Sequence, residues 1–190
     1  MARQEFKLAR SLRLAEAISA EVSQLARSVS DAQFHAPAHA GGWSIGHCLE
    51  HLVLSGSALS HYWDRAIVTG SGPSAGGGDQ FPYTWWEQIV LRWLQNPQRF
   101  RRKTSQALAP QGRYSVPESM ARFTAMQRSM TRRLEAAQDL DLRKTTMRIP
   151  FLPIPRVSLG FAFDAALAHE RRHLEQAWRV RQQLARGHSG

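Results

Sequence analysis

The chain has one cysteine, no long apolar run and few acidic residues, and each shortage excludes a class of protein. Cys48 has no second cysteine to pair with, which excludes an internal disulfide framework and fits a reducing compartment. No apolar run approaches the roughly 20 residues needed to cross a bilayer. Residues 1–20 carry dispersed charges and lack the continuous apolar core of a secretory signal. We therefore expect a soluble, cytoplasmic protein that does not enter membranes.

Basic residues outnumber acidic ones, with 25 Lys and Arg against 15 Asp and Glu and a net charge of +10. Such an excess is typical of proteins that bind nucleic acid or small anions. Here the basic residues are scattered, and the clusters at 99–103 and 128–133 contain a single aromatic residue, Phe100, instead of the repeated interleaved aromatic residues of a stacking platform. A generally basic, solvated surface is therefore favoured over nucleic-acid binding.

Length and composition predict a single domain over 1–190, with a disordered tail at about 186–190. With 43% hydrophobic residues, a chain of 190 residues can bury a core without metal or disulfide cross-links. The sequence shows no internal repeat and no strand long enough to build a sheet. The predicted fold is therefore built from helices alone.

Apolar residues recur at spacings of three and four in four long segments, which indicates amphipathic helices. These helices are predicted over 5–27, 44–69, 117–138 and 158–185. Ser44 has the position of an N-cap. A shorter helix is expected between 81 and Pro97, with Trp85, Trp86 and Trp93 packed on the bundle.

Three prolines interrupt the segment 139–157 and exclude a continuous helix there. We expect this segment to cross one end of the molecule in an extended conformation. The predicted fold is all-α, a four-helix bundle with an additional short helix and a proline-rich crossover before the last helix.

Two histidines lie on the inward face of the last predicted helix. Its stripe contains Ala162, Ala166, His169, His173, Gln176, Val180 and Leu184. Two buried imidazoles cost free energy unless their nitrogens find partners. One metal ion would serve both, because side chains four residues apart project side by side. A pair of ordinary hydrogen-bonded core histidines is the open alternative.

A third histidine lies beside the apolar stripe of the helix predicted over 44–69. His51 shares this flank with small or mildly polar residues, as expected for a cavity wall: Ser44, Cys48, Ser55, Ala58 and Tyr62. His47 lies one turn earlier and further toward solvent, so it ranks second as a ligand. We interpret Cys48 as a small buried residue rather than a nucleophile.

The remaining histidines are predicted to lie outside any site. These are His35, His39 and His61 on the surface and His188 in the tail.

The stretches WSIGHCLEHL (43–52) and HERRHLEQ (169–176), in this order and at this separation, resemble the DinB-like superfamily of four-helix-bundle metalloproteins. The resemblance extends through NPQRFRRKTSQALAP (96–110), ARFTAMQ (121–127) and the proline-rich crossover. It implies a zinc, nickel or iron ion held by His51, His169 and His173, with positions left for water or substrate.

Characterised members of this superfamily include thiol-dependent transferases and isomerases that use mycothiol, bacillithiol or glutathione. Another relative is the iron-binding domain of sulfoxide synthases, whose His-x3-His-x-Glu pattern His169, His173 and Glu175 also match. That enzyme needs a second, catalytic domain. The resemblance therefore implies a metal site more firmly than it implies a reaction.

HERRH also satisfies the His-Glu-x-x-His signature of zinc peptidases. Arg171 and Arg172 stand between the two histidines, where zinc peptidases usually have uncharged residues. The helical wheel places Arg171 on an outer face with Glu175 and Arg179, within reach of i, i+4 pairing. Position 179 is arginine, where one peptidase class needs its third histidine. We therefore reject the peptidase interpretation.

Two further polar residues flank the predicted ligands. Glu170 lies at the edge of the apolar surface, where we expect it to bond a ligand histidine or a neighbouring arginine. This structural use is favoured over a role as general base, which stays open. Gln176, near His173 on the metal stripe, is expected to support a ligand or contact substrate.

Together these features predict a metal-dependent enzyme that activates a small thiol or water for transfer, isomerisation or hydrolysis on a small molecule. The physical basis is that a divalent cation stabilises the anionic nucleophile. The alternative is a non-enzymatic binding module that has a structural metal and binds a partner such as nucleic acid. A homodimer also stays open.

Overall fold

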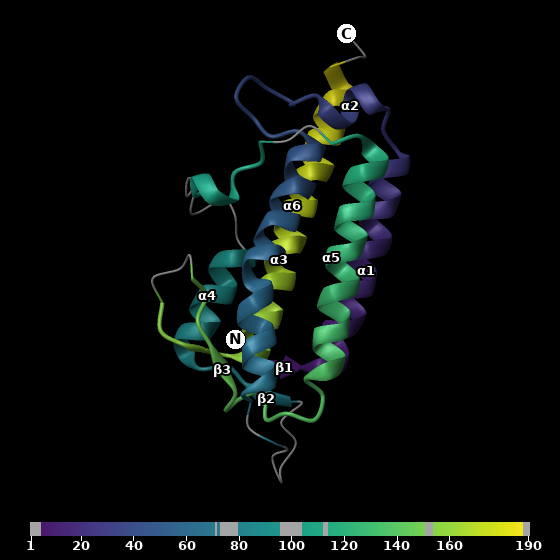
Figure 1. Cartoon of the computed structure of the whole chain (residues 1–190). Helices are drawn as coiled ribbons and strands as arrows, with labels where there is room; N and C mark the ends of the chain where they lie inside the picture. Colours follow the sequence, from purple (N-terminus) through teal and green to yellow (C-terminus); the bar gives the residue numbers. More distant parts are fainter. Residues whose placement is uncertain are drawn as a thin grey trace.

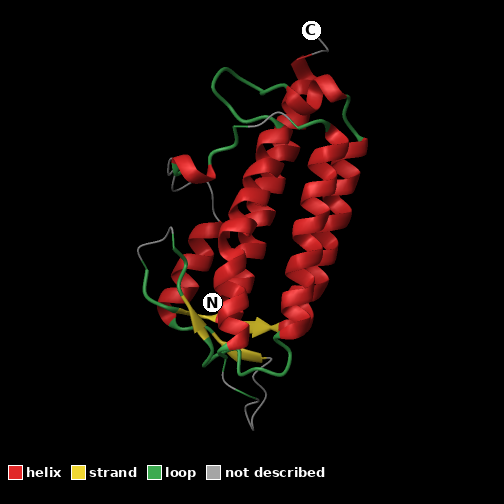
Figure 2. Cartoon of the chain, viewed as in Figure 1, coloured by secondary structure: helices red, strands yellow, loops and turns green. Residues whose placement is uncertain are grey.

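Four long helices, α1, α3, α5 and α6, form the frame of the protein (Figure 1). The computed structural model describes residues 5–70, 72, 80–95, 104–111, 114–150 and 154–187. Its helices are α1 Leu8–Arg27, α2 Asp31–His35, α3 Ile45–Val68, α4 Trp85–Gln95, α5 Val116–Ala136 and α6 Leu159–Gly187, with a 3-10 turn, η2, at Gln106–Leu108. Figure 2 shows that helices dominate and that the few strands gather at one end.

The bundle is a ring in which α3 and α1 each pack against both α5 and α6. α1 and α6 run away from the end that carries the strands, whereas α3 and α5 run toward it (Figure 1). α4 is an additional short helix that packs on α6. The predicted four-helix bundle with one extra short helix is therefore confirmed.

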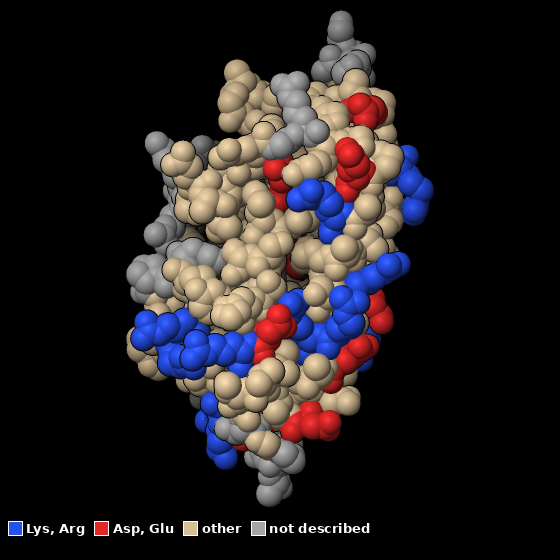
Figure 3. Space-filling model, in the orientation of Figure 1, with Lys and Arg blue, Asp and Glu red and all other residues tan. Residues whose placement is uncertain are grey.

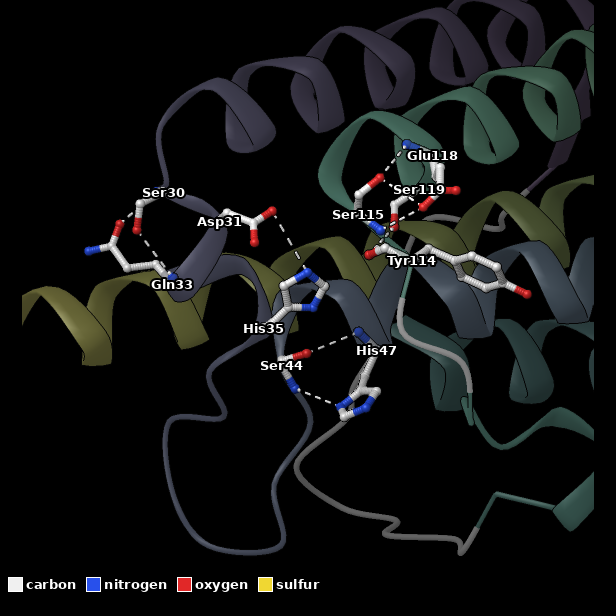
Figure 4. Close-up of polar contacts among 10 residues, drawn as sticks. All are labelled: Ser30, Asp31, Gln33, His35, Ser44, His47, Tyr114, Ser115, Glu118 and Ser119. Carbon is white, nitrogen blue, oxygen red and sulfur yellow. Dashed lines mark hydrogen bonds and ion pairs between the residues drawn. The ribbon is translucent and has the colours of Figure 1, made fainter.

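Side chains that cap the helices explain where α3 and α5 begin. The Ser44 hydroxyl accepts a hydrogen bond from the His47 amide, and His47 Nδ1 accepts one from the Ser44 amide (Figure 4). Ser115 and Glu118 form the same reciprocal arrangement at α5. Each cap satisfies amide groups that have no partner within the helix. Ser44 is thus the N-cap that the sequence predicts.

The short helix α2 was not predicted, although Ser30 and Gln33 form a capping box at its start (Figure 4). Its five residues are too few to show a helical repeat in the sequence. α2 contacts α3 and closes the end of the bundle opposite the strands (Figure 1).

The structure contains two small antiparallel sheets within the described residues, and the first of them corrects the predicted start of the first helix. β1 (Glu5–Lys7) pairs with β2 (Gln80–Pro82), so α1 begins at Leu8 rather than at residue 5. A Cβ atom on Gly160, in the first turn of α6, would lie 2.8 Å from Cζ of Phe81 and 2.9 Å from Cγ of Phe6. Glycine therefore lets this sheet pack directly on α6.

The second sheet pairs the middle of the proline-rich crossover (139–157) with its C-terminal end. β3 (Thr146–Met147) pairs with β4 (Val157–Ser158), immediately before α6. The described parts of this crossover contain no helix and include Pro150 and Pro155, as predicted, whereas Pro153 lies outside the described residues. Pro97 also lies outside them. α6 continues to Gly187, two residues beyond its predicted end at 185.

A buried carboxylate fastens the strand end of the molecule. Asp164 of α6 accepts hydrogen bonds from the Ser11 hydroxyl (2.5 Å), from the Tyr83 hydroxyl (2.5 Å) and from the Arg10 guanidinium. Its carboxylate thus connects α1, the segment before α4, and α6.

No described helix is long and apolar enough to span a membrane.

The buried apolar residues form two clusters, one toward the strands and one toward α2. The first contains Trp63, Leu134 and Phe163, and the second contains Ile18, Leu49 and Leu174. The predicted inward residues Phe123, Met130 and Leu134 of α5 are buried, and Met120 and Met126 are partly buried. Between Ala168, in the first cluster, and Leu174, in the second, α6 carries His169 and His173.

Candidate metal centre

Three imidazoles from two helices converge inside the bundle. His51 comes from α3, and His169 and His173 come from successive turns of α6. The Nε2 atoms of His51 and His169 lie 3.2 Å apart, and one ring nitrogen from each of the three residues lies within 4.8 Å of the others. Two nitrogens that bind one tetrahedral zinc ion at 2.0–2.1 Å lie about 3.3 Å apart. The spacing therefore fits three nitrogen ligands around one divalent ion.

Hydrogen bonds at the opposite ring nitrogens orient two of these histidines. Nδ1 of His51 lies 2.7 Å from the Leu108 carbonyl oxygen, and Nδ1 of His173 lies 3.0 Å from Oε1 of Gln176. Because both oxygens can only accept, we assign the proton of each ring to Nδ1. The Nε2 lone pair is then directed to the centre of the cluster, which is the arrangement of metal-binding histidines.

Burial keeps the three imidazoles uncharged. It lowers the pKa of His169 to about 3, and repulsion from Arg172, and from His51 when that ring is protonated, adds to this effect. Burial is also the main cause that lowers the pKa of His51 and of His173. Since the neutral imidazole is the form that binds metal, this cluster is ready for an ion at neutral pH without losing protons.

The indole of Trp43 lies against the cluster. Its ring centroid is 4.9 Å from that of His51 and 5.6 Å from that of His173, on which it stacks. The sequence marks Trp43 only as part of a motif and did not identify this contact. A signal was available, because an apolar residue immediately before an N-cap commonly packs back on its helix.

A cavity of about 280 Å³ extends from the three histidines between α3, α4 and α6. Its apolar wall includes Leu52, Leu59, Trp63, Trp93, Leu94, Leu108, Ile149 and Ala162. Its polar wall includes Ser55, Thr104, Ser105, Glu170 and Arg172. The histidines therefore lie at the side of a mostly apolar chamber large enough for a small molecule.

The predicted cavity flank of α3 is only partly correct. His51 and Ser55 line the cavity, but Cys48 is completely buried in the apolar cluster toward α2. Burial raises the pKa of the Cys48 thiol to about 12, in keeping with a core residue. Leu52, Leu59 and other members of the apolar stripe also face the cavity, which the helical wheel did not predict.

Glu170 lines the same cavity and is 4% exposed. Nε2 of Gln127, from α5, donates to its Oε2 at 2.6 Å. The predicted partners of Glu170, a ligand histidine or an arginine, are wrong within the described residues. Burial raises the pKa of this carboxyl group to about 8, and the bond from Gln127 opposes the shift. The carboxyl group is therefore mainly protonated at neutral pH.

The other histidines within the described residues do not join the cluster. His47, ranked second as a ligand, uses its Nδ1 atom in the capping box of α3. His39 and His61 are exposed. His35 is half-buried on α2, with Nε2 3.9 Å from an Asp31 carboxylate oxygen, and His188 lies outside the described residues.

Two predictions for the surrounding residues are corrected, for Arg171 and Trp85. Arg171 donates to Glu21 of α1 and is half-buried, rather than lying on an outer face with i, i+4 partners. Glu175 is exposed, as its predicted place on an outer face requires, and lines a different cavity. Trp86 and Trp93 pack against the bundle, but Trp85 is 74% exposed.

The fold and the cluster define a helical bundle with a candidate three-histidine metal site. Residues 14–177 match the DinB superfamily, and the chain belongs to this family. The resemblance seen in the two histidine motifs is thereby confirmed.

A solved structure with a similar fold is that of YfiT from Bacillus subtilis, described as a probable metal-dependent hydrolase with an unusual four-helix bundle topology. The TM-score is 0.60 at 15% sequence identity, and the match covers 94% of this chain and 87% of that one. Likeness at this identity shows a shared fold. No curated protein sequence matches the chain.

Proposed function

We propose that the protein is a metal-dependent enzyme in which His51, His169 and His173 hold one zinc, nickel or iron ion. The observation that carries the proposal is the convergence of three neutral imidazoles at the wall of a cavity. Two of the rings are oriented through their Nδ1 atoms. Paired core histidines would need only hydrogen-bond partners, and would not need an adjoining chamber.

A divalent ion at this position supplies a Lewis acid that favours the deprotonated form of a small thiol or of water. The cavity holds the second reactant in its apolar part, with Trp63 and Trp93 in its wall. Transfer, isomerisation or hydrolysis on a small molecule then depends on which nucleophile and electrophile this space admits. The likeness to YfiT, described as a probable metal-dependent hydrolase, supports the hydrolytic option.

We assign supporting roles to two neighbours of the ligands. Gln176 fixes the ring of His173 through the bond at Nδ1. Glu170 has two open roles, because its carboxyl group both bonds Gln127 and lines the cavity. It either holds α5 against α6 or transfers a proton to or from the reactant. Glu170→Gln would keep a side chain able to bond Gln127 and would abolish turnover only if proton transfer is its role.

Metal content of the purified protein is the direct test. Wild type, His51→Ala and His169→Ala are loaded with zinc, nickel or iron, desalted and analysed for bound metal. Wild type is expected to retain about one ion per chain, and both variants are expected to lose it. His61→Ala is the matched control, because His61 lies on α3 but is exposed outside the cluster. Wild type without stoichiometric metal would end the proposal.

The reaction is tested separately with a panel of electrophiles and esters, each with water alone or with glutathione, mycothiol or bacillithiol. Turnover that needs a thiol and is lost in His169→Ala supports a transferase. Turnover with water alone supports a hydrolase. If the metal-loaded protein turns over nothing with any thiol, the thiol option is rejected.

A further inference from the structure

Arg172 lies at the cavity of the three histidines and has no counter-ion among the residues that the structure describes. It lies between His169 and His173 on α6, is half-buried, and lines the cavity wall. Within the described residues it makes no hydrogen bond or ion pair. Glu175, three residues further along, is exposed and forms no ion pair with it.

The neighbouring arginines differ, because their charges are already matched. Arg171 donates to the Glu21 carboxylate, and Arg10 donates to the Asp164 carboxylate. Both line a second cavity, between α1, α4 and α6, whose wall Arg172 shares. Arg172 alone among the three also lines the cavity of the histidines.

The surroundings of Arg172 favour an added negative charge. Its side chain is half-buried and lines the same cavity wall as His51, His169 and His173, none of which supplies a negative charge. A partly buried cation without a partner costs free energy, which an incoming anion would recover. A bound divalent ion would add to the positive potential.

The rest of the chamber favours an apolar group. Leu59, Trp63 and Leu94 form part of a wall that continues away from the histidines. Glu170, the acidic group of the described wall, accepts a hydrogen bond from Gln127 and forms no ion pair with Arg172. Among its described residues, the chamber therefore combines a cation that has no counter-ion with an apolar surface.

From this geometry we infer that Arg172 binds the anionic group of the substrate, and that the substrate is a small amphipathic anion whose apolar body lies along Leu59, Trp63 and Leu94. The anionic group is a carboxylate or a phosphate-type group, both of which match the planar donors of a guanidinium. The inference rests on the proposed function in taking this cavity as the substrate site. The preference for anions, however, is measurable without metal.

Binding of matched probes tests the inference. Phenylbutyrate, phenylpropylphosphonate and the uncharged phenylbutanol are titrated by calorimetry into metal-free and metal-loaded protein. Wild type is expected to bind at least one anion about ten to a hundred times more tightly than the alcohol. The reason is that each anion can accept a charge-assisted hydrogen bond from Arg172, whereas the uncharged alcohol cannot. The tighter of the two anions identifies the substrate as a carboxylate or as a phosphate-type ester.

Variants of adjacent arginines provide the control. Arg172→Gln is expected to remove the preference for anions and leave phenylbutanol binding unchanged, whereas Arg172→Lys retains part of the preference. Arg171→Gln carries the same charge change on the next residue and should bind like wild type, because Arg171 lies outside this cavity. Circular dichroism on each variant checks that the helices are intact.

The inference is overturned if wild type shows no preference for either anion, if Arg172→Gln keeps the preference, or if Arg171→Gln loses it equally. Failure of the metal proposal would look different. In that case the protein would bind no stoichiometric metal, while the probes would still report on Arg172 in the metal-free protein.

Discussion

At the scale of single residues, the site depends on groups that hold the imidazoles as much as on the imidazoles themselves. The bond between His173 Nδ1 and Gln176 Oε1 fixes both the tautomer and the direction of Nε2. Without this hydrogen bond the His173 ring can rotate in the metal-free protein, and metal binding must then remove this conformational freedom.

Gln176→Ala is therefore expected to weaken metal affinity about tenfold or more, with the fold unchanged. Competition with a chromophoric chelator measures the change. Gln183→Ala is the control, since Gln183 is an exposed residue of the same helix. Equal affinities for Gln176→Ala and wild type would show that Gln176 does not support the ligand.

Cys48 provides a second prediction at this scale. Its thiol is completely buried, and the pKa is raised to about 12, so almost no thiolate forms in the folded protein at pH 8. A thiol-specific chromogenic reagent at pH 8 should leave the native protein unmodified and label one thiol after denaturation. Rapid labelling of the native protein would instead indicate an accessible, reactive cysteine.

The sequence was informative about which residues face inward and less so about their partners. Spacings of three and four placed His169 and His173 on a buried face, and the structure brings His51 to them. The hydrogen bond between His51 Nδ1 and the Leu108 carbonyl oxygen cannot be predicted from the sequence. The segment around Leu108 has no periodic pattern, and any residue could supply a backbone carbonyl at this position. The bond from Gln127 to Glu170 joins residues 43 positions apart, which one helical wheel cannot reveal.

At the scale of elements, Asp164 links parts of the chain that are distant in sequence. Its carboxylate accepts hydrogen bonds from Ser11, Arg10 and Tyr83, and so connects α1 and the segment before α4 to α6 at the strand end. An amide in its place offers one acceptor oxygen and an NH2 group, so at least one of these donors loses its carboxylate acceptor, and Arg10 loses its counter-ion.

Asp164→Asn is expected to lower the free energy of unfolding by about 1–3 kcal/mol, because a buried group loses its acceptor. Urea unfolding followed by circular dichroism measures the loss. Asp139→Asn, at an exposed position, should change stability little. A stability for Asp164→Asn within error of wild type would contradict this role.

The start of a helix can be predicted from the sequence when its cause is local. Ser44 is a predictable N-cap because a hydroxyl stands just before an apolar repeat. The start of α1 is not predictable in this way, because β1 exists only through its pairing with β2, more than 70 residues away. Neither three-residue strand has a pattern that distinguishes it from a helical turn or a loop.

At the scale of the whole molecule, the net charge of +10 bears on partners. On the face shown in Figure 3, basic side chains form separate groups interspersed with acidic ones. A continuous basic surface would release many counterions from a nucleic acid, whereas separate groups release few.

We therefore predict weak binding of duplex and single-stranded oligonucleotides, with little change between low and high salt. Fluorescence anisotropy at two salt concentrations provides the measurement. Tight binding that falls steeply with salt and persists in His51→Ala would instead favour a nucleic-acid-binding module with a structural metal.

A homodimer remains a prediction at this scale. α4 exposes Trp85 and Ile89 one turn apart, at 74% and 54%. Light scattering on the purified protein determines the oligomeric state.

The central claim is that His51, His169 and His173 together hold one divalent ion. Crystals grown with zinc, nickel or iron and measured on both sides of the metal absorption edge test it most directly. The account predicts a single anomalous peak per chain within about 2.0–2.2 Å of one nitrogen of each ring. An anomalous map with no peak among these three rings, or with the ion bound elsewhere, would contradict it.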